Sequence, residues 1–409
     1  MRALAGIAAL LALAWVLSEN RREIRWRTVA GGVALQFALA FLLIWLPPAA
    51  RALLLLNRAV GALQRATDAG TAFVFGYLAG PPLPFVETHP GASFILAFQA
   101  LPLVLVISAL ASLLFHWGVL QQVLRAFAWL LRHWLGVGGA LALGASVHVF
   151  VGMIEAPLLV RPWLARMQRG ELFALMSCGM AGIAGTVMVI YATILGPIIP
   201  NALGNILIAS VISTPAALAI AALMVPFAPT EDEARIVLPY APVSLLDAIV
   251  KGTTDGIPVL AGIVAVLLVT VSLVALVNLL LGALAFAEPL TLQSIFSLPF
   301  RPIVWLIGVP WGESVTAAGL MATKTVLNEF VAYVDFARLP SGALGEKSRL
   351  IMTYALCGFA NFGSLGILIG GLGVMVPERR EEVVALGFRS IVSGTLATCT
   401  SGAVAGLLG

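Results

Sequence analysis

Charged residues are scarce in this sequence. Only 10% of its 409 residues are Asp, Glu, Lys or Arg, whereas 61% are hydrophobic, and the mean hydropathy is +1.04. This composition excludes an ordinary water-soluble globular protein and indicates a chain that lies mostly in a lipid bilayer. The net charge of +4 is small, and the basic residues sit in short connectors between apolar runs. They therefore report membrane topology, and no nucleic-acid partner is expected.

Cysteine is nearly absent as well. Cys178, Cys357 and Cys399 all fall within apolar runs and give neither a disulfide framework nor a metal-binding spacing. We predict no cofactor and no metal site. An intramembrane enzyme that uses Glu155 and Glu329 as an acid/base pair is an alternative, but the sequence has no paired histidines and no nucleophile elbow to support it.

Apolar runs of membrane-spanning length recur along the chain. Their lengths predict an all-α polytopic membrane protein with eight transmembrane helices, at residues 4–17, 29–46, 93–115, 172–195, 201–225, 256–286, 350–376 and 383–408. Two further stretches, 136–163 and 298–339, are interrupted by glycine, proline and ionisable residues. We expect these two to be re-entrant hairpins that do not cross the membrane. Amphipathic stretches at 51–77 and 121–134 are expected to lie along the interface.

The first connector sets the predicted topology. Arg21, Arg22, Arg25 and Arg27 separate the first two spans, which places this connector in the cytoplasm and the N-terminus outside. A signal peptide is the alternative for 4–17, because the run is short and begins after a basic residue. The basic cluster follows the run and no small-residue cleavage site is evident, which favours a span.

The two halves of the chain resemble one another where they are most irregular. Each has an interrupted stretch that carries a glutamate (Glu155, Glu329), then a charged connector, then a span broken by glycines. One additional crossing separates the copies, so the second copy should be inverted, as in secondary transporters. A duplicated structural scaffold is the alternative, although intramembrane carboxylates argue for function. The expected segments are 1–117, 118–227, 228–290 and 291–409, which divide between a transport domain and a scaffold domain.

The polar groups of these irregular segments are hydrogen-bonding groups. They comprise the carboxylates of Glu155 and Glu329, the amide of Asn361 and the hydroxyl of Ser364, with Phe359 nearby. Carboxylates accept hydrogen bonds, whereas amides both donate and accept them. An uncharged substrate that has hydroxyl groups and is partly aromatic fits this mixture, whereas an anion fits poorly.

Two charged residues of the second hairpin form a separate candidate pair. Glu313 and Lys324 lie eleven residues apart, which places them on one face of an unbroken helix. We predict an internal structural pair, with contact of one of them to the ligand as the alternative.

Three motifs resemble the concentrative nucleoside transporter family. They are Gly152-x-x-Glu155-Ala156-Pro157, Asn328-Glu329-Phe330-Val331-Ala332-Tyr333, and the run from Cys357 to Gly366 that contains Asn361-Phe362-Gly363-Ser364. The resemblance implies a nucleoside importer of the bacterial inner membrane. It also implies a homotrimer of eight-span subunits, in which a mobile transport domain slides against a fixed trimerisation scaffold.

The resemblance also implies the substrate-binding residues. Glu329, Asn361 and Ser364 would bond the sugar hydroxyls, and Phe359 would pack beside them. In the family a Gly-Gln-Thr-Glu run, helped by a valine on the next helix, holds the base. The corresponding residues in this chain are Gly152, Met153, Ile154, Glu155 and Val187. The two polar residues that would contact the base in the family are thus replaced by Met153 and Ile154 here, which predicts an altered or broadened base preference.

A second departure concerns the coupling ion. The positions that bind sodium in sodium-coupled relatives hold His148, Val151, Gly182 and Ile183 in this chain. Two side-chain oxygens are thus missing, and hard cations require oxygen ligands. Since histidine can itself carry a proton, the prediction is symport with H⁺ rather than Na⁺, with His148, Glu155 or Glu329 as carrier. A neutral His148 bonded within the hairpin, a sodium-coupled symporter and a channel for small polar solutes are the alternatives.

Overall fold

The computed structural model of the protein describes residues 2–87, 93–153, 155–230, 242–283 and 290–409. Within these ranges the regular secondary structure is helical, with no strand. Five of the described helical segments are long and apolar enough to cross a membrane: Trp26–Trp45, Leu96–His116, Ala202–Met224, Leu245–Gly282 and Pro377–Leu408. The all-helical fold predicted from composition is therefore confirmed.

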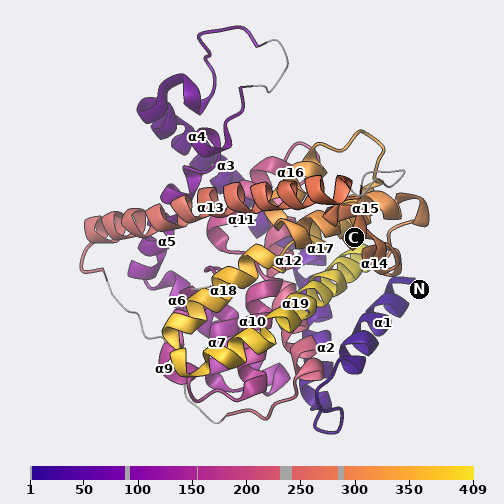
Figure 1. The fold of residues 1–409 in the computed structure, drawn as a ribbon. Coiled ribbons are helices and arrows are strands. Elements are labelled where there is room, and N and C mark those ends of the chain that lie inside the picture. Colours follow the sequence, from indigo (N-terminus) through magenta and orange to yellow (C-terminus); the bar gives the residue numbers. More distant parts are fainter. Residues whose placement is uncertain (1, 88–92, 154, 231–241, 284–289) are drawn as a thin grey trace.

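The N-terminal part supplies helices α1 to α6 and a 3-10 turn. Their bounds are α1 Arg2–Val16, α2 Trp26–Trp45, α3 Pro47–Phe75, η1 Gly76–Ala79, α4 Leu96–Gln99, α5 Leu103–His116 and α6 Val119–Leu135. The helix α3 packs on α2 and α12, and its end projects with α4 at the upper left of Figure 1. The helix α6 is amphipathic, with Leu124 and Leu131 buried and Trp129 exposed, which fits an interfacial helix.

Two series of helices follow in matching order. The first series is α7 Gly139–Val147, α8 Glu155–Leu159, α9 Arg161–Leu164, α10 Arg169–Ala181, α11 Gly185–Leu195 and α12 Ala202–Met224. After α13 (Leu245–Gly282), the second is α14 Leu292–Leu306, η2 Trp311–Glu313, α15 Ser314–Val326, α16 Glu329–Ala337, α17 Glu346–Ala355, α18 Phe362–Met375, η3 Pro377–Arg379 and α19 Arg380–Leu408. Both spans that were predicted to be glycine-broken, 172–195 and 350–376, are interrupted, between α10 and α11 and between α17 and α18.

The two breaks cross at the centre of the fold. Phe359 N donates a hydrogen bond to Gly182 O at 3.2 Å, which joins one break directly to the other. A Cβ at Gly358 would lie 2.9 Å from Met180 O and 3.0 Å from Ala181 O, so only glycine lets the two backbones approach this closely. The helices α10, α12, α17 and α19 pack around this crossing, and α10 and α12 are almost wholly buried.

The helix α13 starts earlier than the sequence suggested. The expected span began at Gly256, but α13 begins at Leu245 and includes the polar residues Asp247, Lys251 and Asp255. Ser244 caps the helix by accepting from Asp247 N at 3.1 Å, and Lys251 pairs with Asp255 one turn on at 2.7 Å. A cap and an i,i+4 ion pair favour helix at these polar positions, so the predicted boundary was wrong. The acidic connector 231–235 lies outside the described residues.

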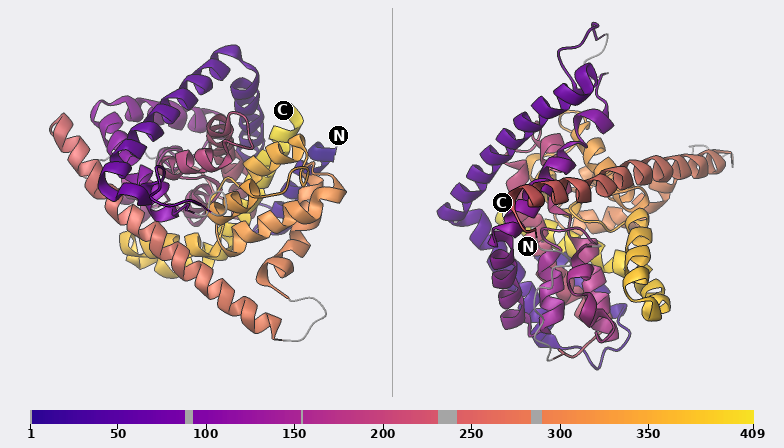
Figure 2. Two further views of the ribbon diagram at one scale, coloured as in Figure 1. Left: turned by 90° about the horizontal axis from the view of Figure 1, so that it is seen from above. Right: turned by 90° about the vertical axis from the view of Figure 1, so that its left-hand side faces the viewer.

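The long helix α13 lies at the side of the bundle and packs mainly on α5. Figure 2 shows it as one continuous rod that passes beyond the other helices. At the contact, a Cβ at Gly252 would lie 2.6 Å from Ser108 O, which shows how closely the two helices approach. Much of the rest of α13 is covered by neither α5 nor the bundle, and Leu268, Leu276 and Leu279 are more than half exposed.

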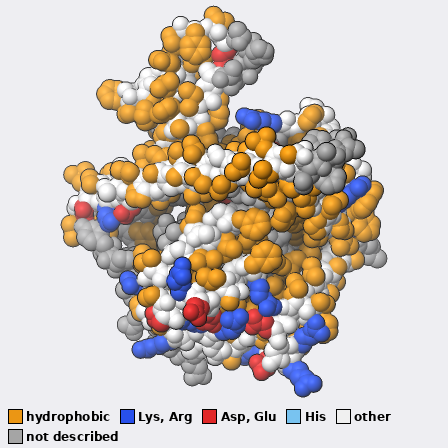
Figure 3. All heavy atoms as spheres, in the orientation of Figure 1, with side chains coloured by type: hydrophobic (Ala, Val, Ile, Leu, Met, Phe, Trp, Pro, Cys, Tyr) orange, Lys and Arg blue, Asp and Glu red, His pale blue; other side chains and the backbone are white. Residues whose placement is uncertain are grey.

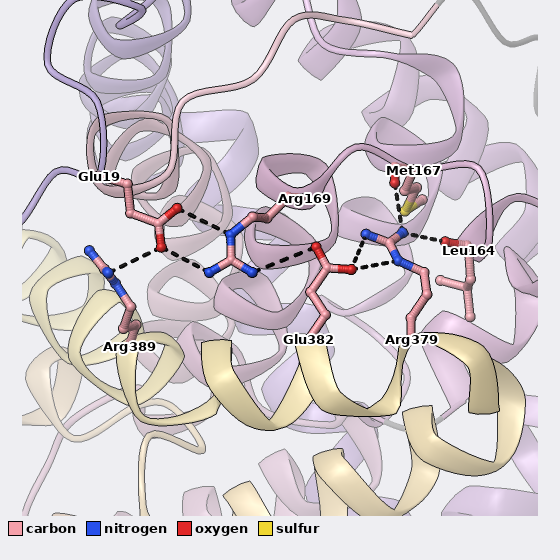
Figure 4. A network of polar contacts seen from close by, with 7 residues as sticks. All are labelled: Glu19, Leu164, Met167, Arg169, Arg379, Glu382 and Arg389. Carbon is pink, nitrogen blue, oxygen red and sulfur yellow. Dashed lines mark hydrogen bonds and ion pairs between the residues drawn. The ribbon is translucent and has the colours of Figure 1, made fainter.

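Charged side chains gather mainly on one part of the surface, in the lower part of Figure 3. A network there joins the α1–α2 connector to α10 and α19 (Figure 4). The Glu19 carboxylate accepts from Arg169 at 3.0 Å and from Arg389 at 3.1 Å, and hydrogen bonding to Arg169 holds the pKa of Glu19 below its usual value. Arg379 pairs with Glu382 at 2.6 Å. Arg379, directly before α19, also donates to the carbonyl oxygens of Leu164 and Met167, so the start of α19 is held against the chain just after the first interrupted segment.

Candidate functional site

A cavity of about 660 Å³ opens beside the crossing of the two breaks. Its lining comes from the first interrupted segment, from α11, from the start of α16, from the second break, and from α5 and α13. The residues that matter below are Phe150, Val151, Gly152, Met153, Val187, Ile190, Tyr191, Asn328, Glu329, Phe359, Asn361 and Ser364. This volume lies in the range of small-molecule sites.

One end of the cavity is built around the carboxylate of Glu329. Tyr191 Oη donates to its Oε1 at 2.7 Å, and Asn361 Nδ2 donates to its Oε2 at 2.9 Å. Glu329 is only 4% exposed and Asn361 is fully buried. These two bonds fix the carboxylate and leave it further lone pairs to accept hydrogen bonds from a ligand.

Two helix N-termini converge at this end. Asn328 Oδ1 caps α16 by accepting from Val331 N at 2.9 Å, and Asn361 Oδ1 caps α18 by accepting from Ser364 N at 2.7 Å. The first turns of both helices, which carry Glu329 and Ser364, therefore border the cavity. The partial positive charge of helix N-termini stabilises the carboxylate and favours hydrogen-bond acceptors near it. A hydroxyl group can accept from such an N-terminus and donate to Glu329, so this end suits a ligand with several hydroxyl groups.

Most of the remaining wall is apolar, although Ser108, Ser112, Lys251 and Asp255 also line the cavity. It includes Phe150 and Met153 from the first interrupted segment and Val187 and Ile190 from α11. Phe359, from the second break, also lines the cavity. An aromatic ring without many specific hydrogen bonds fits such a surface.

Most of the predicted substrate-binding residues meet at this cavity. Those that line it are Gly152, Met153, Val187, Glu329, Phe359, Asn361 and Ser364. Ile154 lies outside the described residues. Glu155 begins α8, but its side chain is not described. The residues from the two halves are thus brought together as the internal repeat predicts.

The predicted ion-coupling residues lie beside the cavity. Val151 lines it, whereas His148 is 3% exposed and Gly182 and Ile183 are buried in the first break. A Cβ at Gly179 would lie 3.1 Å from His148 Cε1, so the imidazole packs onto this glycine of α10. Its Nε2 is buried and has no hydrogen-bond partner among the described residues.

Sequence reasoning missed Tyr191, which is 2% exposed and donates to Glu329. The only signal was its spacing: Tyr191 follows Val187 by four residues and so shares its face of α11. Its ring also packs near Phe330 and Tyr333, with centroids 6.0 and 5.0 Å apart. Tyr191 thus links α11 to the second half of the chain at the cavity.

Comparison with known proteins agrees with this arrangement. Residues 5–78 and 205–406 match the family models described as the N-terminus and C-terminus of the Na⁺-dependent nucleoside transporter. Residues 97–198 match a model described as nucleoside recognition. An uncharacterized transporter of Haemophilus influenzae is 40% identical over 98% of this chain and 96% of its own length. The putative nucleoside permease NupX of Escherichia coli is 33% identical over 99% of this chain and 98% of its own length.

The chain belongs to the concentrative nucleoside transporter family. Nucleoside permease NupC of Helicobacter pylori, 32% identical over 98% of this chain and 96% of its own, is a further relative. The solved structure of CNTnw in an inward-facing substrate-bound state superposes with a TM-score of 0.90 at 36% identity, covering 100% of this chain and 98% of that one. The family and fold are those of a transporter and not of an enzyme.

Loss of the Tyr191 hydroxyl should weaken ligand binding by this transporter. In Tyr191→Phe the carboxylate of Glu329 loses one of its two donors, and a hydrogen bond to a charged group contributes about 1.5–3 kcal/mol. We expect the Kd for nucleoside, measured by isothermal titration of purified protein, to rise roughly tenfold or more. Tyr333→Phe is the matched control, because that hydroxyl donates to Thr353 O at 2.9 Å and its residue does not line the cavity. Equal affinities of the two variants would contradict this role.

Proposed function

We propose that the protein imports nucleosides by symport with protons. The observation that carries this proposal is the two-part cavity: a polar end formed by Glu329, Asn361 and Ser364, and an apolar wall that includes Met153 and Val187. A nucleoside has the same two-part character, since its sugar carries hydroxyl groups and its base is a flat aromatic ring. The sugar would bond the polar end, and the base would lie along the apolar wall beside Phe359.

The sugar contacts follow from the hydrogen-bond inventory of the polar end. A sugar hydroxyl can donate to Glu329 and at the same time accept from an amide or a hydroxyl. Asn361 and Ser364 supply such groups at the first turn of α18. Because Tyr191 and Asn361 already hold the carboxylate in place, little side-chain entropy is lost on binding.

The base contacts are poorer in hydrogen bonds. Met153 lines the apolar wall, and the next residue, Ile154, is also apolar. Each hydrogen bond that a base cannot form here forgoes about 0.5–1.5 kcal/mol of discrimination. We therefore propose a base preference that is altered or broadened relative to family members with polar residues at these two positions.

Proton coupling is supported by the surroundings of His148. Its imidazole is buried at the C-terminal end of α7 with an unbonded Nε2, and Gly182 offers no side-chain oxygen. Helix C-termini favour positive charge, whereas burial opposes it, so His148 would carry a proton only in a state of the transporter that admits water to it, while a hard cation lacks ligands here. The related family models are described as sodium-dependent, which makes sodium symport the competing proposal.

The remaining architecture is proposed from the same reasoning. Eight spans and two re-entrant hairpins form two inverted halves, with the N-terminus outside the bacterial inner membrane. The segments are 1–117, 118–227, 228–290 and 291–409. The apolar faces of α3 and α13 left open by the bundle suit a homotrimer, because large exposed apolar surfaces mark lipid or protein contacts. In this arrangement α3, α5 and α13 form the scaffold, and the remaining helices form the moving transport domain.

The coupling ion can be assigned by uptake into proteoliposomes under separate gradients. We expect an inward proton gradient to drive accumulation of radiolabelled uridine and a sodium gradient at equal pH on both sides to have little effect. His148→Asn, which cannot titrate, should lose the pH-driven component. Strong stimulation of the wild-type protein by sodium alone would contradict proton coupling. Uptake that neither saturates nor exceeds equilibrium would instead indicate a channel.

Base preference can be tested by restoring polar groups at the apolar wall. The double variant Met153→Gln, Ile154→Thr gains an amide and a hydroxyl that can bond a base edge. We expect the order of uptake of uridine, cytidine, adenosine and guanosine to change, by roughly three- to tenfold for each bond gained. Val189→Ala, in the same helix as Val187 but outside the cavity lining, is the control. An unchanged order in the double variant would show that these positions do not contact the base.

A further inference from the structure

Lys324 is a fully buried ammonium in the second half of the chain. Its Nζ donates to Ala355 O at 2.8 Å and to Thr398 Oγ1 at 3.0 Å. Among the described side chains no carboxylate lies within 4.0 Å of it. The predicted pair with Glu313 is not formed, because three helical turns, about 16 Å of rise, separate the two residues. Glu313 accepts from Gly345 N at 3.1 Å instead. A buried charge without a carboxylate partner needs other compensation.

The compensation comes from two helix C-termini. Lys324 lies in the last turn of α15, and Ala355 is the last residue of α17. The carbonyl of Ala355 would normally accept from residue 359 of a continuing helix, but Phe359 N donates to Gly182 O across the breaks. The ammonium therefore satisfies a carbonyl left without its helical partner, and it neutralises the partial negative charge of both helix ends.

Among the side chains that the structure describes, the corresponding place in the first half holds no such cation. There α7 ends at Val147 and His148 follows as its C-cap, packed on Gly179 near the end of α10. His148 precedes Glu155 by seven residues, and Lys324 precedes Glu329 by five. Each hairpin thus carries one buried basic side chain where its first helix meets the following broken helix. Only the second has a fixed positive charge with hydrogen-bond partners.

We propose that Lys324 is a tethered cation. In the second half of the chain it compensates the negative helix ends as a bound inorganic cation would. Its ammonium fastens α15 to the end of α17, and this positions Glu329 and Asn361 at the cavity. An exchangeable cation, whether a proton or a metal ion, is then needed only in the first half. The effect of Lys324 on substrate rests on the proposed function, but its role as a cation does not.

The cation role can be tested without any substrate. Lys324→Ala removes the side chain beyond Cβ, and propylammonium has the size and the three N–H donors of the missing part. We expect the purified variant to have a lower melting temperature than the wild type, and propylammonium to raise it in the variant alone. Tetramethylammonium carries the same charge but has no N–H donor, so it should not raise the melting temperature of the variant. A Lys347→Ala variant, which removes an exposed lysine of α17, should show no response to propylammonium.

Three results would overturn the proposal. The first is a Lys324→Ala protein that melts like the wild type. The second is a destabilised variant that propylammonium does not stabilise. The third, decisive if Lys324→Ala cannot be purified, is an unchanged melting temperature in Thr398→Val, which removes one acceptor of the ammonium and keeps its charge. If wild-type protein binds no nucleoside yet the melting experiment succeeds, the proposed function fails and the tethered cation stands.

The positioning role adds a substrate readout. We expect Lys324→Ala to lose roughly tenfold or more in nucleoside affinity and to recover most of it with propylammonium. Affinity that stays at the wild-type value in the variant would show that Lys324 does not position Glu329 and Asn361.

Discussion

The fold depends on a constraint that lipid imposes on the backbone. An interrupted helix leaves donors and acceptors unpaired, and hydrocarbon cannot satisfy them. This chain interrupts two helices and places the interruptions against each other, so that Phe359 N bonds Gly182 O. Asn361 caps the resumed helix α18, and Lys324 satisfies the end of α17. The polar groups at the centre of the molecule are thus satisfied because donors freed at one break bond acceptors freed at the other, and because Asn361 and Lys324 satisfy helix ends.

The cavity is a consequence of the same arrangement. Resuming helices present their N-termini, with free donors and partial positive charge, to the space beside the crossing. Glu329 can therefore be buried and still available, because it lies in the first turn of α16 and accepts from Tyr191 and Asn361. The first half contributes an apolar wall that includes Met153 and Val187. Two similar halves thus produce one site with chemically different ends.

The broken spans and the polar end of the cavity could be predicted from the sequence, because short runs of neighbouring residues mark them. Glycines at 179, 182 and 358 predict the broken spans, and the motifs around Glu329 and Asn361 identify the family and the polar end. The hydrogen bond from Tyr191 to Glu329 could not be predicted from the sequence, because Tyr191 lies 138 residues away and resembles any tyrosine of an apolar helix. The spacing of Glu313 and Lys324 misled because residues three turns apart share a helix face but lie about 16 Å apart along the axis. The start of α13 was placed too late because capping and ion pairing outweighed the polarity of its first turns.

A structure of the protein with bound uridine tests the central claim most directly. The account predicts ribose hydroxyls within hydrogen-bond distance of Glu329 and Asn361, and the uracil ring against Met153 and Val187. A nucleoside bound the other way round, or bound outside the cavity between the two crossed breaks, would contradict it.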